Sequence, residues 1–230
     1  MKLITCSRCI LDTSINDIWF DDNGECKYCK IHDELEKAHP MGPSLKTELD
    51  KVVFKIKKAG KNKKYDCIAG VSGGRDSTYV LLTAKRLGLR PLAVHFDNGW
   101  NSDISVRNIK NACNKLNIDL ETYVIDYEEI KDLLRSYMRA GLPWVDNPTD
   151  QAIRSILFKI AKRENVKYIL VGTDFRSEGK QPTEWTYSDT KQLKYIHKKY
   201  GDVKLKTYPL VSFPKYIYYG YLKKIKVVQP

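Results

Sequence analysis

Short apolar runs alternate with longer amphipathic stretches from residue 65 onward, and this alternation constrains the possible fold more than any other feature. We predict strands over 65–71, 91–96, 120–125 and 168–172, and helices over 76–87, 103–116, 127–139 and 150–164. Apolar strands that alternate with helices form a parallel sheet that is covered on both faces. The sequence therefore predicts an α/β domain built on a doubly wound parallel sheet.

The chain length and composition fit one such domain with a small appendage. The sequence has 230 residues, and its 42% hydrophobic and 30% charged residues are globular values that exclude extensive disorder. No run approaches the ~20 apolar residues of a membrane span. The N-terminus lacks the apolar core of a signal peptide. We therefore expect a cytoplasmic protein.

Positive charge is concentrated in two segments. The formal net charge is +12, with eight lysines in residues 46–64 and ten in residues 191–226. Such an excess favours an anionic partner: a nucleic acid, a membrane surface or a phosphorylated metabolite. The alternative is a solvated lysine face without a partner. Charge alone does not choose between these interpretations.

Four of the six cysteines form two Cys-x-x-Cys pairs with sixteen residues between them: Cys6, Cys9, Cys26 and Cys29. A two-residue gap lets both thiolates of a pair reach one metal ion, and two pairs complete a tetrahedron. Disulfides are the alternative, which a cytosolic context opposes. We predict a structural Zn²⁺, because four thiolates leave no open position. Cys67 and Cys113 lie on apolar strand and helix positions and are predicted core residues.

Three parts follow from these patterns. We expect a zinc-binding module at 1–38, a linker with a basic amphipathic helix at 39–64, and the α/β domain at 65–230. The apolar side of the basic helix is formed by Leu49, Val52, Val53 and Ile56.

The first predicted strand runs directly into a glycine-containing hexapeptide, Ser72-Gly73-Gly74-Arg75-Asp76-Ser77, and then into a helix. Adjacent glycines let the backbone approach an anion, and the helix start adds a favourable dipole. Asp76 and Ser77 fall on the first turn, where a carboxylate can hold Mg²⁺ and a hydroxyl can meet a phosphate. The Walker A ending Gly-Lys-Ser/Thr is absent, which argues against γ-phosphoryl transfer. An ordinary Gly-Gly turn is the alternative.

This hexapeptide resembles the SGGxDS signature of the PP-loop ATP pyrophosphatases, which include NAD, GMP and asparagine synthetases and tRNA-modifying enzymes. The resemblance implies that the loop binds the pyrophosphate of ATP and that Asp76 binds Mg²⁺. The implied ATP-binding positions in the loop are Ser72, Gly73, Gly74, Arg75 and Ser77.

Two further segments fit the same resemblance. His95-Phe96-Asp97-Asn98 ends the second predicted strand, where such enzymes hold adenosine, and Asp97 or Asn98 is placed to meet the ribose or base. For His95, a buried strand position is an equal alternative. The segment from Gly172 is similar to that of NAD synthetases in which a threonine and a glutamate face the phosphates and metal. The resemblance gives those roles to Thr173 and Glu178, and makes Asp76 and Glu178 a Mg²⁺ pair.

Nearly the whole chain resembles the N-acetyl sugar amidotransferase family. The segments that carry this resemblance are the first Cys-x-x-Cys, FDDNGECKYC, VSGGRDS, VHFDNGWNS, GTDFRSEG and YIHKKYGDVKLKTYPL. It implies ATP-dependent conversion of the N-acetyl group of a nucleotide-activated sugar to an acetamidino group, with release of AMP and pyrophosphate. Such enzymes serve lipopolysaccharide, pseudaminic acid and flagellin glycosylation pathways.

The resemblance also sets the expected partners. With no glutaminase pattern visible, ammonia would come from solution or from a separate glutaminase subunit, and the substrate would be an N-acetylated nucleotide sugar rather than a nucleic acid or a membrane. Two departures stand out. Asp174 occupies a position where asparagine is more usual, and family members usually extend well beyond IKVVQP, which reads as a strand leading into further sequence. By position alone, the expected substrate wall consists of Trp100, Asn101, Ser102, Trp144, Asp146 and Asp150.

Two alternative functions stay open at this stage. A tRNA-modifying PP-loop enzyme, which performs thiolation or lysidine formation, fits the positive charge and the cysteine pairs. Many thiolation enzymes need a reactive cysteine, however, and a closed zinc cluster does not supply one. The second alternative is a nucleotide-binding chain without catalysis.

Overall fold

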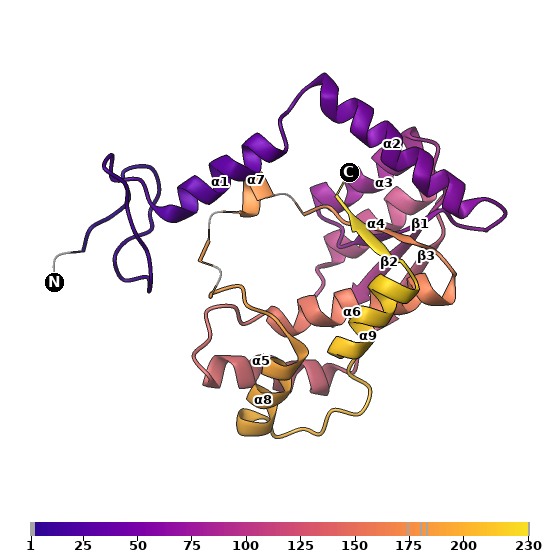
Figure 1. Ribbon diagram of the computed structural model, residues 1–230. Helices are drawn as coiled ribbons and strands as arrows, with labels where there is room; N and C mark the ends of the chain where they lie inside the picture. Colours follow the sequence, from indigo (N-terminus) through magenta and orange to yellow (C-terminus); the bar gives the residue numbers. More distant parts are fainter. Residues whose placement is uncertain (1–2, 174, 180, 183, 230) are drawn as a thin grey trace. The chain divides into compact units, whose positions relative to one another are not determined.

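A computed structural model describes residues 3–173, 175–179, 181–182 and 184–229 (Figure 1). By its internal contacts the chain divides into two compact units, which are Met1–Glu48 with Asp174–Tyr187, and Leu49–Thr173 with Ser188–Pro230. This grouping assigns the later segment, Asp174–Tyr187, to the unit that carries the paired cysteines, whereas the sequence-based division places it with the α/β domain. We describe each unit by itself.

The first unit is small and has little regular structure. It contains α1 (Lys27–Ala38), the first residues of α2 (Pro43–Gly60) and the short α7 (Phe175–Glu178). The segment before α1 forms the isolated antiparallel bridges Thr5↔Asp12 and Phe20↔Cys26. The turn that closes the second bridge uses Gly24 at φ +76°, which glycine adopts without strain.

The second unit is a five-stranded sheet with strand order β3-β2-β1-β4-β5, and every pairing is parallel. Its strands are β1 (Cys67–Val71), β2 (Pro91–Asp97), β3 (Leu120–Val124), β4 (Tyr168–Leu170) and β5 (Lys226–Val228). Its helices are α3 (Arg75–Arg86), α4 (Asp103–Leu116), α5 (Tyr127–Arg139), α6 (Asn147–Arg163), α8 (Thr190–Tyr200) and α9 (Phe213–Ile217), with a π-helical turn, η1, at Tyr218–Leu222. The predicted α/β fold with a parallel sheet is confirmed.

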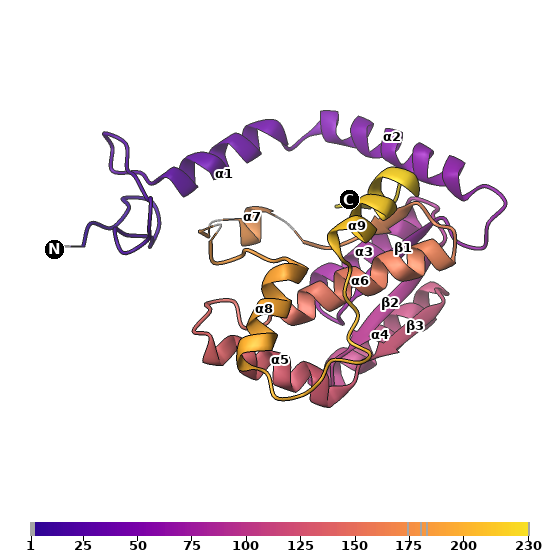
Figure 2. The same ribbon diagram turned by 60° about the horizontal axis from the view of Figure 1, so that its bottom comes forward.

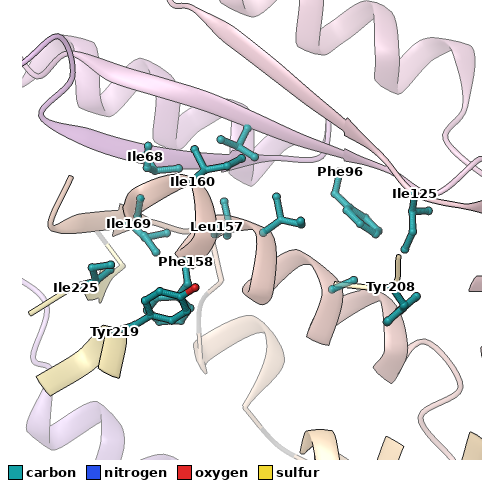
Figure 3. Close-up of a cluster of buried hydrophobic side chains, with 14 of the residues drawn as sticks. Ile68, Phe96, Ile125, Leu157, Phe158, Ile160, Ile169, Tyr208, Tyr219 and Ile225 are labelled. Atoms are coloured by element: carbon teal, nitrogen blue, oxygen red, sulfur yellow. The ribbon is translucent and has the colours of Figure 1, made fainter. Parts of the chain in front are cut away.

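Alternate residues of the central strand face two separate cores. Cys67 and Ala69 of β1 pack with α2, α3 and α4 on one face, while Ile68 packs with α5, α6 and α8 on the other. Figures 1 and 2 show α6 lying along the sheet, with α5 and α8 beside each other, and Figure 3 shows the α6-side cluster. This period of two follows from the pleat of a strand that is buried on both faces. It explains why β1 reads as an unbroken apolar run.

Two buried carboxylates of α5 hold the segment that follows α8. Glu129 accepts the backbone N–H groups of Lys206 at 2.6 Å and Thr207 at 2.9 Å. Asp132 accepts those of Asp202 and Val203 at 3.1 Å. Buried carboxylates are costly unless they are hydrogen-bonded in this way. The contacts therefore fix an otherwise irregular, lysine-rich segment against the α/β unit.

No helix in the described residues combines the length and hydropathy needed to cross a bilayer.

The core on the α6 face should be sensitive to cavity formation. Ile68→Ala removes a fully buried side chain, and we expect it to lower the free energy of unfolding by about 3 kcal/mol. Val124→Ala, in the same sheet but 70% exposed, should change it by less than about 0.5 kcal/mol. Urea unfolding followed by circular dichroism measures both. Equal effects would contradict the two-sided burial of the sheet.

Candidate functional site

The hexapeptide forms the turn between β1 and α3, at the carboxyl end of the central strand. Register places Val71, the last residue of β1, opposite His95 of β2, and β4 lies on the other side of β1. The predicted segments at residues 95–98 and 172–173 therefore leave the sheet on either side of the loop. Carboxyl ends of parallel strands are the usual ligand site in such sheets.

Two glycines are required by close packing of the backbone. Gly73 has φ +79°, and a Cβ there would lie 2.3 Å from the carbonyl oxygen of Ser105. A Cβ at Gly172 would lie 3.1 Å from both the carbonyl carbon of Asp76 and the nitrogen of Ser77. The loop is thus pressed between the start of α4 and the end of β4. The sequence analysis explained these glycines by close approach of the backbone to an anion. In the structure, close approach of the loop backbone to neighbouring protein atoms already requires them.

Hydroxyl groups fix the shape of the loop. The Oγ atom of Ser77 accepts the N–H of Ser72 at 3.2 Å and lies 3.1 Å from the Oγ atom of Ser72. Asn108 of α4 donates from Nδ2 to the carbonyl of Gly73 at 3.3 Å. Gly74 is the N-cap of α3 and has no side chain to cap the helix start. The start of α3 is therefore of the kind that binds anions at helix N-termini, and anion binding by this turn stays a prediction.

Two charged side chains follow the glycines. Arg75 and Asp76 are both exposed, with Arg75 Nε 3.5 Å from a carboxylate oxygen of Asp76, a pair that solvent screens strongly. Mg²⁺ in nucleotide sites is held by one or two carboxylates together with phosphate oxygens. Asp76 fits such a role, because its carboxylate is solvent-accessible on the first turn beside the anion site. Arg75 adds positive charge at the same place.

His95 and Phe96 point to opposite faces of β2. The ring of His95 is buried, and its Nδ1 donates to the carbonyl of Val71 at 3.2 Å, which supports the strand end that carries the loop. Its Nε2 has no hydrogen-bond partner in the described part of the chain. Phe96 lies in the α6-side core and stacks on Tyr123. Direct cofactor contact by either ring stays a prediction.

Asp97 and Asn98 shape the turn that follows β2. Asp97 Oδ1 accepts from the N–H of Gly99 and from Nδ2 of Asn101, both at 3.0 Å, and Asn98 Oδ1 accepts the N–H of Trp100 at 3.1 Å. These bonds use the side chains to hold the turn. Their predicted contacts with ribose or base require lone pairs that the turn does not use, and stay predictions.

The predicted segment after β4 is divided between the two units. The Oγ1 atom of Thr173 accepts from Nε2 of Gln229 at 2.6 Å, a contact that no sequence pattern predicts. Glu178 is exposed on α7 and belongs to the first unit, whereas Asp76 belongs to the second. The Mg²⁺ pair of Asp76 and Glu178 therefore stays a prediction, and Asp174 lies outside the described residues. Asn108 and Gln229, both missed from the sequence, carry no motif that marks them.

The paired cysteines meet in the first unit. The four sulfur atoms lie within 4.8 Å of one another, and those of Cys9 and Cys26 are 3.6 Å apart. A tetrahedral ion with Zn–S bonds of about 2.3 Å separates its sulfurs by about 3.8 Å. The arrangement fits a structural zinc ion.

The surroundings of the cluster favour thiolate at one position. Burial by itself raises the pKa of the Cys6 thiol, but backbone N–H groups, including those of Arg8 and Cys26, outweigh it and lower this pKa to about 6. Zinc binds the thiolate form. The other two cysteines, Cys67 and Cys113, are buried in the core between α2, α3, α4 and the sheet, as predicted, and burial raises the pKa of both.

Gly73→Ala tests the role of the loop. The added Cβ would collide with the carbonyl of Ser105, so we expect at least a tenfold loss of ATP–Mg²⁺ affinity, roughly, with some loss of stability. Gly141→Ala is the matched control, because Gly141 also has positive φ but nothing within 4 Å of its added Cβ. Calorimetric titration measures both. Unchanged ATP affinity in Gly73→Ala would place the nucleotide elsewhere.

Metal content tests the cysteine cluster. We expect one zinc ion per chain by elemental analysis, and its loss in Cys26→Ser, because three thiolates no longer close the tetrahedron. Cys113→Ser, which alters a core cysteine, should retain the metal. Protein that carries no zinc after purification without chelators would contradict the assignment.

Comparison with known proteins supports part of this interpretation. The family model described as queuosine biosynthesis protein QueC matches residues 66–174, which include the loop, β2 and the segment through Thr173. An uncharacterized protein of Methanocaldococcus jannaschii is 30% identical over 172 residues. These are 73% of this chain, and the chain spans 58% of that protein's length.

Solved structures are similar in parts of the fold. NMN synthetase from Francisella tularensis has a TM-score of 0.45 at 18% identity, over 78% of this chain and 71% of that chain. NH3-dependent NAD synthetase from Campylobacter jejuni has a TM-score of 0.42 at 17% identity, over 65% and 70%. A predicted subunit of tRNA methyltransferase from M. jannaschii has a TM-score of 0.39 at 14% identity, over 71% and 67%.

The parallel sheet with a glycine loop after its central strand is the PP-loop type of fold, and the QueC family model matches the region of the chain that contains this loop.

Proposed function

We propose that this chain is an ATP-dependent amidotransferase that converts the N-acetyl group of a nucleotide-activated sugar into an acetamidino group. The observation that supports ATP binding is the loop of residues 72–77. Its glycine backbone packs closely against the protein and leads into the start of α3, where the N-cap residue makes no side-chain hydrogen bond. The sugar half rests on the resemblance of the segments around the cysteines, the loop and residues 94–102 and 172–179 to sugar amidotransferases. We place the reaction in the cytoplasm, where ATP is available and thiols stay reduced.

An amide is a poor electrophile, and ATP activates it. The acetamido oxygen attacks the α-phosphorus, the bond to the β,γ-diphosphate breaks, and pyrophosphate leaves. Ammonia then attacks the imidate carbon, loses a proton and expels AMP, which carries away the original amide oxygen. The products are the amidine, AMP and pyrophosphate.

The loop residues serve the departing pyrophosphate. Negative charge grows on its oxygens as the bond breaks, and hydrogen bonds between Ser72 and Ser77 and from Asn108 to Gly73 hold the loop that leads into α3 before the reaction begins. Preorganised donors of this kind stabilise a transition state without reorganisation. Asp76 would hold Mg²⁺, which neutralises charge on the leaving group when bound.

Ammonia requires a separate source in this proposal. A glutaminase of the cysteine type needs an accessible, activated thiol. Within these 230 residues, four cysteines form the cluster and the other two are buried core residues with raised pKa values. A partner glutaminase, or free ammonia, would therefore supply the nitrogen.

A tRNA-modifying activity is the second candidate. The matching family model is named for queuosine biosynthesis, and the net charge of +12 suits a polyanionic substrate. Thiolation through a persulfide fits less well, because the cysteines outside the cluster are buried. A nucleotide-binding chain without catalysis is the remaining alternative.

Product analysis tests the chemistry. With ATP, Mg²⁺, ammonia and an N-acetylated nucleotide sugar, we expect AMP and pyrophosphate in equal amounts, and ¹⁸O in the acetamido group should appear in AMP. Asp76→Asn should reduce kcat by about 100-fold or more with a smaller effect on ATP affinity, because the charge that it balances grows in the transition state.

The outcomes separate the candidates. ADP as product would contradict the pyrophosphatase class. AMP formed only when tRNA is present would support the second candidate, and pyrophosphate release without amidine would show that the sugar is not the acceptor.

A further inference from the structure

A groove of about 750 Å³ lies in the α/β unit, between the first half of α6, the start of α8 and residues 211–216. Its floor includes Gln151 and Ser155, which are buried polar residues of α6. Its rim carries basic and aromatic side chains. This volume is in the range of small-molecule sites, which lie between about 300 and 1,000 Å³.

Hydrogen bonds between the three walls fix the shape of the groove. Nε2 of Gln151 donates to the carbonyl of Asp189 at 3.0 Å, which ties α6 to the start of α8. The Oγ1 atom of Thr190 donates to the carbonyl of Val211 at 2.7 Å, which ties α8 to the third wall. The groove is therefore a built feature of the fold rather than a gap between loose segments.

The rim is positively charged. Arg154, Lys191 and Lys194 line it, and none of the three forms an ion pair within the described residues. The one carboxylate in the lining, Asp189, accepts the N–H of Gln192 as the N-cap of α8. Three cations around a partly enclosed space favour an anion with more than one charge.

Two aromatic rings stand beside these cations. Phe213 is 75% exposed and Tyr216 is 49% exposed, and Phe158 packs edge-on against Tyr216 and holds it in place. Exposed aromatic rings at a groove are costly in water and typically mark a binding surface. Together with the cations they suit a ligand that carries both phosphate groups and a planar base.

The groove lies toward the same edge of the sheet as the loop of residues 72–77. Leu157 of α6 packs against Gly70 of β1, since a Cβ at Gly70 would lie 3.4 Å from it. α6 leads into the parallel strand β4, so it runs opposite to the strands, and its residues before Leu157 lie toward their carboxyl ends. The groove is on the α6 face, and α3 and α4 are on the other face.

We propose that this groove binds the nucleoside diphosphate part of the acceptor substrate. This inference rests on the proposed function, because it supplies the substrate site that the reaction needs beside the ATP loop. Arg154, Lys191 and Lys194 contact the diphosphate, and Phe213 and Tyr216 contact the base. ATP and acceptor then approach the carboxyl edge of the sheet from opposite faces.

Calorimetric titration with UDP, in the presence of saturating ATP–Mg²⁺, tests the proposal on the full chain. Arg154→Gln, Lys194→Gln and Phe213→Ala should each weaken UDP binding by roughly tenfold. Lys198→Gln removes the same charge from α8 outside the groove, and Phe54→Ala removes an exposed ring from α2, so both should bind UDP as the wild type does. Thermal unfolding of every variant checks that the fold is intact.

Each outcome has a defined meaning. No UDP binding to the wild type, or equal binding to the groove and control variants, overturns the groove assignment. Tighter binding of a short oligouridylate RNA that the same variants abolish overturns the acceptor as its source and assigns the groove to RNA. Asp76→Asn, which is expected to slow the reaction, should retain UDP binding, because Asp76 does not line the groove. If UDP binds through the groove but no AMP forms with any acceptor, the proposed function fails and the groove assignment stands.

Discussion

The candidate site depends on the burial of β1 on both of its faces. Cys67, Ala69 and Val71 pack on the α3–α4 side, Ile68 packs on the α6 side, and β2 and β4 pair with both of its edges. A strand held on four sides cannot slip by one residue without exposing apolar side chains and burying the wrong ones. The position of its carboxyl end is therefore well defined, and so is the position of the first residue of the loop that starts there.

Backbone contacts, rather than charged side chains, determine the shape of the loop. Gly73 meets the carbonyl of Ser105, and Gly172 meets the first turn of α3. Side-chain hydroxyl and amide groups complete the arrangement, and the ionisable groups Arg75 and Asp76 stay exposed at its surface. The loop residues thus fall into two groups: those that determine its shape, and the exposed charged residues Arg75 and Asp76, which are available to a ligand. A substitution in the first group would affect folding and binding together, whereas one in the second would affect mainly the ligand.

The sequence predicted most of the α/β unit because its strands are apolar and its helices are amphipathic. The helices at 103–116 and 127–139 begin and end at the predicted residues. α8 and α9 were not predicted: α8 is lysine-rich with weak apolar periodicity and relies on tertiary contacts such as that of His197 with Asp132, and α9 is only five residues long. Glu129 and Asp132 of α5 are buried in the structure, although charged residues on an amphipathic helix are expected at its surface. For the site, the loop was visible as a motif, but its partners Asn108 and Gln229 lie far away in the sequence and carry no local signal.

The distribution of cysteines predicts two separate rates of thiol modification, one for each compact unit. Cys67 and Cys113 lie in the core of the α/β unit, whereas the other four cysteines belong to the small N-terminal unit. A thiol is alkylated only when it is exposed and ionised. Opening of the small unit would release four reactive positions, and opening of the large unit would release two. Mass spectrometry of alkylation over time would therefore report local opening of each unit at individual cysteines.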